Sequence, residues 1–97
     1  MPTFIALTSF TEQGIRDVKN STKRADAVRE AAKKFGCNMT HLYWTLGNYD
    51  LVGIIEAQDE MSATAFALSI GAAGNVRTQT LRAFSRDEMN GILGKMA

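Results

Sequence analysis

The chain has 97 residues and a mass of 10.6 kDa, which is room for one domain, residues 1–97, with an expected radius of gyration of about 12–13 Å. A net charge of +1 gives no field that would favour nucleic acid or an anionic membrane, so neither is expected as a partner. A single cysteine and a single histidine exclude an intrachain disulfide and a metal cluster built from one chain, and we expect no metal and no cofactor.

The start of the chain has neither the basic segment nor the apolar run of a signal peptide, and no apolar stretch is long enough to cross a membrane. The sequence therefore predicts a soluble cytoplasmic protein. The 45% apolar share includes 13 alanines, so the core is thin for a chain of this size. Association with a second copy is expected to help the fold.

The first predicted element is a strand over residues 3–10, because apolar side chains occur on both of its faces. Thr11 can cap a short helix through Lys19, and Ser21 can cap a second helix that ends at Gly36. The second helix has an apolar stripe spaced by three and four residues, formed by Ala25, Val28, Ala32 and Phe35.

Residues 38–46 alternate, and a Gly-Asn turn signal separates them from residues 50–57, which predicts a β-hairpin. Asp59 can cap an alanine-rich helix that ends in the region 71–74. We expect its apolar side to consist of Met61, Ala65, Leu68 and Ala72, with Phe66 and Ile70 beside them. A last strand is predicted over residues 76–84, and a capping box at residues 85–88 opens a short C-terminal helix.

The order β-α-β-β-α-β-α with right-handed crossovers predicts an α+β, ferredoxin-like βαββαβ fold. It has a four-stranded antiparallel sheet, helices on one face and a short C-terminal helix. The other face of the sheet needs a partner, and packing it against a second copy would leave a cleft between the sheets. We expect that open face to carry one face of the hairpin together with Phe4, Phe10, Thr78, Thr80 and Arg82.

The segment Gly47-Asn48-Tyr49-Asp50, preceded by Tyr43-Trp44-Thr45-Leu46, resembles the signature of the GYD domain family. Further similarity is found in Gln13-Gly14-Ile15, in Phe66-Ala67-Leu68 and in Thr80-Leu81-Arg82-Ala83-Phe84, so it spans nearly the whole chain. The family is small and prokaryotic, and it resembles the dimeric α+β barrel group. The resemblance implies the fold and no particular activity. The thin core and the uncovered sheet face predict a homodimer or higher oligomer, for which a small-molecule ligand is a candidate partner.

Tyr49 and Asp50 have two interpretations at the hairpin turn. They can be a local folding device, or a hydroxyl donor and a carboxylate base at the mouth of the cleft. Arg82 can bind a carboxylate through two hydrogen bonds, or it can form an ion pair with Glu56 or Asp50. No catalytic residue is assigned, and the candidate ligand-binding residues are Tyr43, Tyr49, Asp50, Thr78, Thr80 and Arg82.

The leading hypothesis is a cytoplasmic homo-oligomer that binds a small molecule or has a regulatory or structural role. The alternative is a cofactor-independent enzyme for proton transfer, similar to a tautomerase or isomerase, with its site between the sheets of a dimer. Removal of Met1 would leave Pro2 as a free secondary amine, which tautomerases use as a base. RNA binding is not expected, since residues 50–57 contain no aromatic side chain for base stacking.

Overall fold

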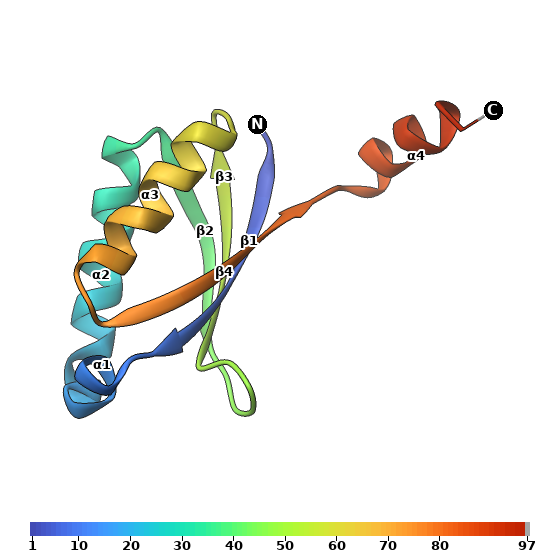
Figure 1. The fold of residues 1–97 in the computed structure, drawn as a ribbon. Helices are drawn as coiled ribbons and strands as arrows, with labels where there is room; N and C mark the ends of the chain where they lie inside the picture. The colour runs from blue at the N-terminus through green and yellow to red at the C-terminus, as the bar shows by residue number, and fades with distance from the viewer. Residues whose placement is uncertain (97) are drawn as a thin grey trace.

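The computed structural model describes residues 1–96, which form an α+β fold of the ferredoxin-like type (Figure 1). The elements follow the predicted order, with one short 3-10 turn (η1) added. In chain order they are β1 (Thr3–Phe10), α1 (Glu12–Arg16), η1 (Val18–Asn20), α2 (Ser21–Lys34), β2 (Cys37–Trp44), β3 (Leu51–Ala57), α3 (Glu60–Ala72), β4 (Val76–Ala83) and α4 (Arg86–Gly94).

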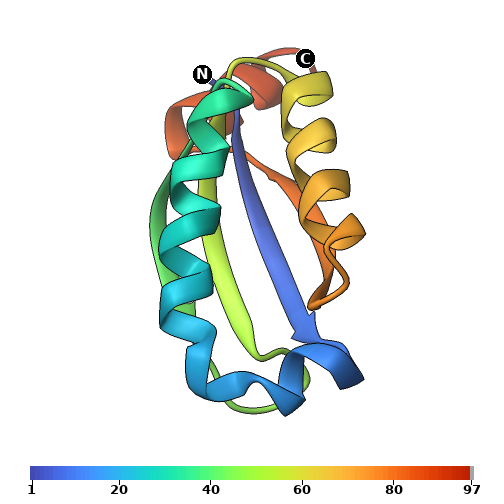
Figure 2. The same cartoon turned by 90° about the vertical axis from the view of Figure 1, so that its left-hand side faces the viewer.

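The four strands form one antiparallel sheet in the order β2-β3-β1-β4. In the register of the sheet, Ile5 of β1 lies opposite Ile54 of β3 and Leu81 of β4. Helices α2 and α3 lie on the same face of the sheet, α2 against β2 and α3 against β4 and β3 (Figure 2). The predicted architecture is therefore confirmed.

The hydrophobic core lies between these two helices and the sheet. Phe4 of β1, Ile55 of β3 and Phe66 of α3 belong to one buried cluster, in which Phe66 is only 1% exposed. The Phe66 ring lies 5.9 Å from the ring of Phe35, centroid to centroid. Ala32 of α2 is completely buried, so the small side chain brings this helix close to the sheet.

The prediction of which strand face stays open was wrong. Phe4 is buried under the helices, and Phe10 and Arg82 lie on the same side of the sheet as Phe4 because side chains alternate along each strand. Both faces of β1 are apolar, so alternation alone could not decide which one the helices cover. The open face instead carries the apolar side chains of Ile5, Leu7, Val52, Ile54 and Leu81.

A β-bulge between Met39 and His41 breaks the predicted unbroken alternation of the hairpin. Met39 lies opposite the buried Ile55, whereas His41 lies opposite Ile54 on the open face. Tyr43 follows His41 onto the open face, as its position opposite Val52 shows. The bulge thus moves the rings of His41 and Tyr43 onto the open face.

The helix starts follow local capping rules with one exception. Thr11, Asp59 and Ser85 cap α1, α3 and α4 as predicted, each accepting a hydrogen bond from a backbone N–H in the first turn. Ser21 is the first residue of α2 and not its cap, since the turn Val18–Asn20 leads directly into the helix. The 3-10 turn η1 thus precedes α2 where a side-chain cap was expected.

Helix α3 presents a different side to the core from the predicted one. Ala63, Phe66 and Ile70 pack into or against the buried cluster, whereas Met61 and Leu68 are 84% and 69% exposed. Apolar residues occur all around this alanine-rich helix, so their periodicity could not identify the buried side. Two large apolar side chains therefore remain on the outer surface of α3.

Helix α4 extends away from the rest of the molecule, on the side of the open face (Figure 1). None of its residues is buried. The molecule is 51 Å long, and its radius of gyration of 14.5 Å exceeds the expectation for a compact chain of this length. The apolar residues Met89 and Leu93 lie one turn apart on α4 and are 43% and 49% exposed. We call this helix the C-terminal arm.

Candidate functional site

The six candidate ligand-binding residues do not form one site. Thr78, Thr80 and Arg82 lie on the helix-covered face of β4, whereas Tyr43 lies on the open face of β2. Tyr49 and Asp50 belong to the loop 45–50 that joins β2 to β3. A cleft between the open faces of two sheets would therefore exclude Thr78, Thr80 and Arg82, and of the six candidates only Tyr43 and the loop residues could border it.

Asp50 fastens the hairpin loop to the central strand. Its carboxylate oxygen Oδ2 accepts a hydrogen bond from the backbone N–H of Phe10 at 2.8 Å, and its own N–H donates to the carbonyl of Thr8 at 2.8 Å. Its carbonyl accepts from the N–H of Thr45 at 2.8 Å, which closes the loop. These three bonds support the interpretation of Asp50 as a folding device, because its carboxylate already accepts a hydrogen bond from the backbone of β1.

The two tyrosines border the open face. The Tyr49 hydroxyl donates to Oε1 of Gln79 at 2.8 Å, and Gln79 lies opposite Leu7 on that face. The Tyr43 ring is 56% exposed and stacks on the imidazole of His41, with centroids 6.3 Å apart and planes inclined by 20°. Two tyrosine rings with polar hydroxyl groups therefore lie beside an apolar surface, and tyrosine is enriched at protein interfaces.

Arg82 ties the C-terminal arm to the sheet. Its guanidinium lies 3.3 Å from the carboxylate of Glu88 in α4, so its partner is neither Glu56 nor Asp50. The pKa of Glu88 is lowered, mainly by the hydrogen bond from the backbone N–H of Ser85 and further by the Arg82 charge. The arginine thus holds the first turn of the arm.

The same guanidinium stacks on aromatic rings of its own chain. It lies 4.5 Å from the ring centroid of Phe84 and 5.7 Å from that of Phe4, and it donates to the carbonyls of Thr3 and Ala83. Most of its binding capacity is used within the chain, which favours a structural role for Arg82 over the capture of an anion.

We expect Arg82→Ala to lower the free energy of unfolding by about 1–2 kcal/mol, since each of the two stacked rings contributes on the order of 0.5–1 kcal/mol. Urea denaturation followed by circular dichroism measures this. Arg77→Ala is the matched control on the opposite face of the same strand, where the residue is exposed, and it should leave stability unchanged. Equal stability of both variants would contradict the structural role of Arg82.

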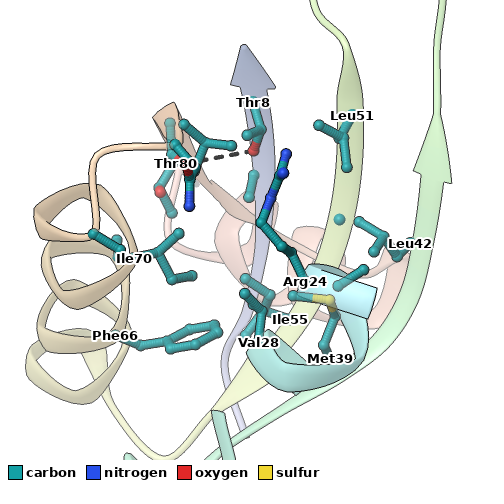
Figure 3. Close-up of a pocket in the computed structure, with 18 of the residues that line it drawn as sticks. Thr8, Arg24, Val28, Met39, Leu42, Leu51, Ile55, Phe66, Ile70 and Thr80 are labelled. Carbon is teal, nitrogen blue, oxygen red and sulfur yellow. Dashed lines mark hydrogen bonds between the residues drawn. The ribbon is translucent and has the colours of Figure 1, made fainter. Parts of the chain in front are cut away.

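A cavity of about 140 Å³ lies between α2, α3 and the sheet (Figure 3). Each helix packs mainly over an outer strand, and the middle strands carry the small residues Ala6 and Gly53 beneath the gap. The predicted residues Thr78 and Thr80 line this cavity. The sequence analysis did not anticipate it, although small side chains at these helix-facing positions are the signal that could have indicated it.

Residues 1–96 contain no group of three or more His, Cys, Asp or Glu placed to hold a metal ion. Burial, and secondarily the charge of Asp59, raises the pKa of the Cys37 thiol, which therefore stays protonated. Among the same residues, no helix has the length and apolar character needed to cross a bilayer.

Comparison with known proteins identifies a family and shows similarity to proteins from Thermus thermophilus. The sequence model of the GYD domain matches residues 4–93. The chain is similar to a protein named "Glutamine synthetase and cystathionine beta-lyase binding protein", with 36% identity over 84 residues that cover 86% of this chain and 88% of that protein. It is also similar to the crystal structure of TTHA0845, with a TM-score of 0.58 and 25% identity, over 88% of this chain and 95% of the other.

Proposed function

Since the chain belongs to the GYD domain family, we propose that it is a homodimer that binds another protein and acts through this binding in a regulatory or structural role. The observation that carries the proposal is the apolar open face of the sheet, which the chain's own helices leave uncovered. The proposal puts the homodimer in the cytoplasm, which the free thiol of Cys37 supports.

The open face suits a second copy of the chain. Ile5, Leu7, Val52 and Ile54 lie side by side on the two middle strands and are half-buried in one chain, and Leu81 is 39% exposed. Packing two such faces together would remove this surface from water, at about 25 cal/mol per Å² of apolar area. A two-fold axis makes the surface self-complementary, since each copy presents the same residues to the other.

The C-terminal arm supports the same arrangement. It projects on the side of the open face, and its apolar residues Met89 and Leu93 have no buried position in their own chain. A second copy seated on the open face would lie beside the arm of the first. The arm then gains the apolar contacts that its own core does not provide.

The partner protein is proposed from the relative. The Thermus protein is named for binding glutamine synthetase and cystathionine β-lyase, and we propose the corresponding two enzymes of the source organism as the partners to test first. The exposed Met61 and Leu68 of α3 lie on the far side of the sheet from the open face, so the proposed dimer would leave them free to contact a partner.

We expect the wild-type chain to sediment at twice 10.6 kDa and Ile54→Asp to sediment as a monomer. A carboxylate at the centre of the open face would be desolvated in the dimer without a partner charge. Leu68→Asp is the matched control, because it makes a similar change on the outer side of α3, and it should remain a dimer. A monomeric wild type, or a dimeric Ile54→Asp variant, would contradict the proposed interface.

Partner binding is tested separately with the two purified enzymes. The immobilised wild-type protein should retain at least one of them, and Leu68→Asp should lose this retention although it remains dimeric. Failure of the wild type to bind either enzyme would contradict the proposed partners and leave the dimer test unaffected.

A further inference from the structure

The cavity between α2 and α3 is partly open to solvent, and its walls consist mainly of apolar side chains. Its walls include Val28 of α2, Leu42 of β2, Ile55 of β3 and Ile70 of α3, which approach from four different elements (Figure 3). Such a surface offers a water molecule few hydrogen-bond partners, so an apolar group would occupy it more favourably than water. The cavity therefore has the chemistry of a site for a hydrophobic group.

One end of the cavity is polar. Thr8 and Thr78 face each other there, with their hydroxyl oxygens 3.5 Å apart. The Arg24 side chain points into the same space from α2, and its guanidinium lies 6.0 Å from the ring centroid of Phe10. Hydroxyl and guanidinium groups at one end, with apolar walls elsewhere, would fix the orientation of a ligand that has one polar group.

The position of Arg24 is fixed before any ligand binds. Its NH1 group donates to the carbonyl and the Oδ2 of Asp17 at 2.6 Å and 3.0 Å, and its NH2 group donates to the carbonyl of Gly14 at 3.2 Å. These contacts use three of the five N–H donors of a guanidinium, which leaves donors for an additional acceptor. The side chain is 21% exposed, so a charge near it is partly shielded from water.

The volume limits the size of the group that the cavity can bury. A cavity of about 140 Å³ is close to the engineered cavity of about 150 Å³ that accommodates one benzene molecule. A single ring or a short branched chain fills this space, which is partly open to solvent, so the volume limits the group that is buried and not the whole ligand.

We propose that this cavity binds a small molecule that consists of one hydrophobic ring and one carboxylate, with the ring between Val28 and Ile70 and the carboxylate at Arg24 and Thr8. The site lies on the helix-covered side of the sheet, so it is separate from the proposed dimer interface. It goes beyond the proposed binding of another protein, because it adds a small-molecule ligand to the same chain.

Benzoate and benzene are the probes that test this site in the wild-type protein. Nuclear magnetic resonance should show nuclear Overhauser effects from the ring protons of both probes to the methyl groups of Val28 and Ile70. Benzoate should bind more tightly than benzene by about tenfold, because a charge-assisted hydrogen bond adds to the apolar contacts. Absence of binding at millimolar probe, or contacts with the open face instead, would overturn the proposal.

Two variants separate the apolar and polar parts of the site. Gly53→Val places a side chain in the cavity, where a Cβ meets its nearest neighbour, Leu42 Cδ1, at an ordinary 3.7 Å, and it should abolish binding of both probes. Arg24→Gln should remove the preference for benzoate and leave benzene binding unchanged. Unchanged binding of both probes by either variant would overturn the corresponding part of the proposal.

Gly71→Val is the matched control, because a Cβ at this position meets no atom within 4 Å and Gly71 does not line the cavity. It should bind both probes as the wild type does. If Gly53→Val does not fold, Gly53→Ala provides the same test with a single methyl group, and it should weaken binding of both probes severalfold. All variants should remain dimers, which distinguishes failure of the ligand site from failure of the proposed assembly.

Discussion

Replacing Phe66 by alanine should lower the free energy of unfolding by about 4 kcal/mol, since removal of a buried aromatic ring costs roughly 3–5 kcal/mol. Phe66 is 1% exposed, and its side chain connects α3 to the buried residues of the sheet. The substitution also removes the ring pair with Phe35, whose planes are inclined by 42°. Domains of this size have a free energy of unfolding of roughly 5–15 kcal/mol. If the wild type is near the lower end of this range, the variant should be close to unfolded.

Urea denaturation followed by circular dichroism measures this loss. Leu68→Ala is the matched control on the same helix, because Leu68 is 69% exposed and its removal should change stability by less than about 0.5 kcal/mol. A loss below about 2 kcal/mol for Phe66→Ala would show that the core relaxes around the missing ring.

Replacing Gly14 by alanine should lower the free energy of unfolding by about 3 kcal/mol, from overpacking and a weakened backbone hydrogen bond. A Cβ at this position would lie 1.9 Å from the backbone oxygen of Asn75. That oxygen cannot move away freely, because it also accepts a hydrogen bond from the N–H of Thr11 at 3.0 Å. The hydroxyl of Thr11 donates to the carbonyl of Gly74 at 2.5 Å and fastens the same two segments.

Thermal unfolding measured by calorimetry compares this variant with Gly91→Ala. A Cβ at Gly91 meets nothing within 4 Å, and Gly91 lies inside α4, so alanine there should stabilise the helix slightly. If Gly14→Ala melts at the wild-type temperature, the loop at residues 74–75 moves more easily than its hydrogen bonds indicate.

The fold was predictable because most of its signals are local. The bounds of β1, the cap at Asp59 and the capping box at residues 85–88 depend on side chains a few residues apart in the sequence. Gly36, where α2 was predicted to end, adopts a φ of 70°, a conformation that glycine permits. Such features are specified by chemistry within one turn or one strand.

The faces of the elements were not predictable by the same rules. β1 has Phe4 and Ala6 on one side and Ile5 and Leu7 on the other, so tertiary packing, in which Phe4 and Ala6 join Phe66 in one buried cluster, decides which side is covered. Likewise, the bulge after Met39 depends on the pairing of β2 with β3. The alternation of apolar and polar residues within β2 alone does not indicate it.

The candidate residues were expected at one site but lie on two different faces of the sheet, because the covered face of each strand could not be predicted from the sequence. Thr78, Thr80 and Arg82 were correctly placed on one row of β4, but the row points toward the helices and away from Tyr43 and Tyr49. The cavity arises because two helices cover different strands, which is a property of the tertiary structure. Small residues such as Ala6 and Gly53 indicate a cavity only once it is known that their side of the sheet faces the helices.

The stability of the helix in the C-terminal arm depends on whether another molecule packs against it. A nine-residue helix is shorter than the roughly 12–15 residues that an isolated helix needs to be stable in water. Its own chain buries none of its residues, so the capping box and the contact of Arg82 with Glu88 have to offset the ordering entropy of the arm. Any molecule that packs against the arm adds its binding free energy to this helix, so folding of the arm and association become one equilibrium governed by mass action.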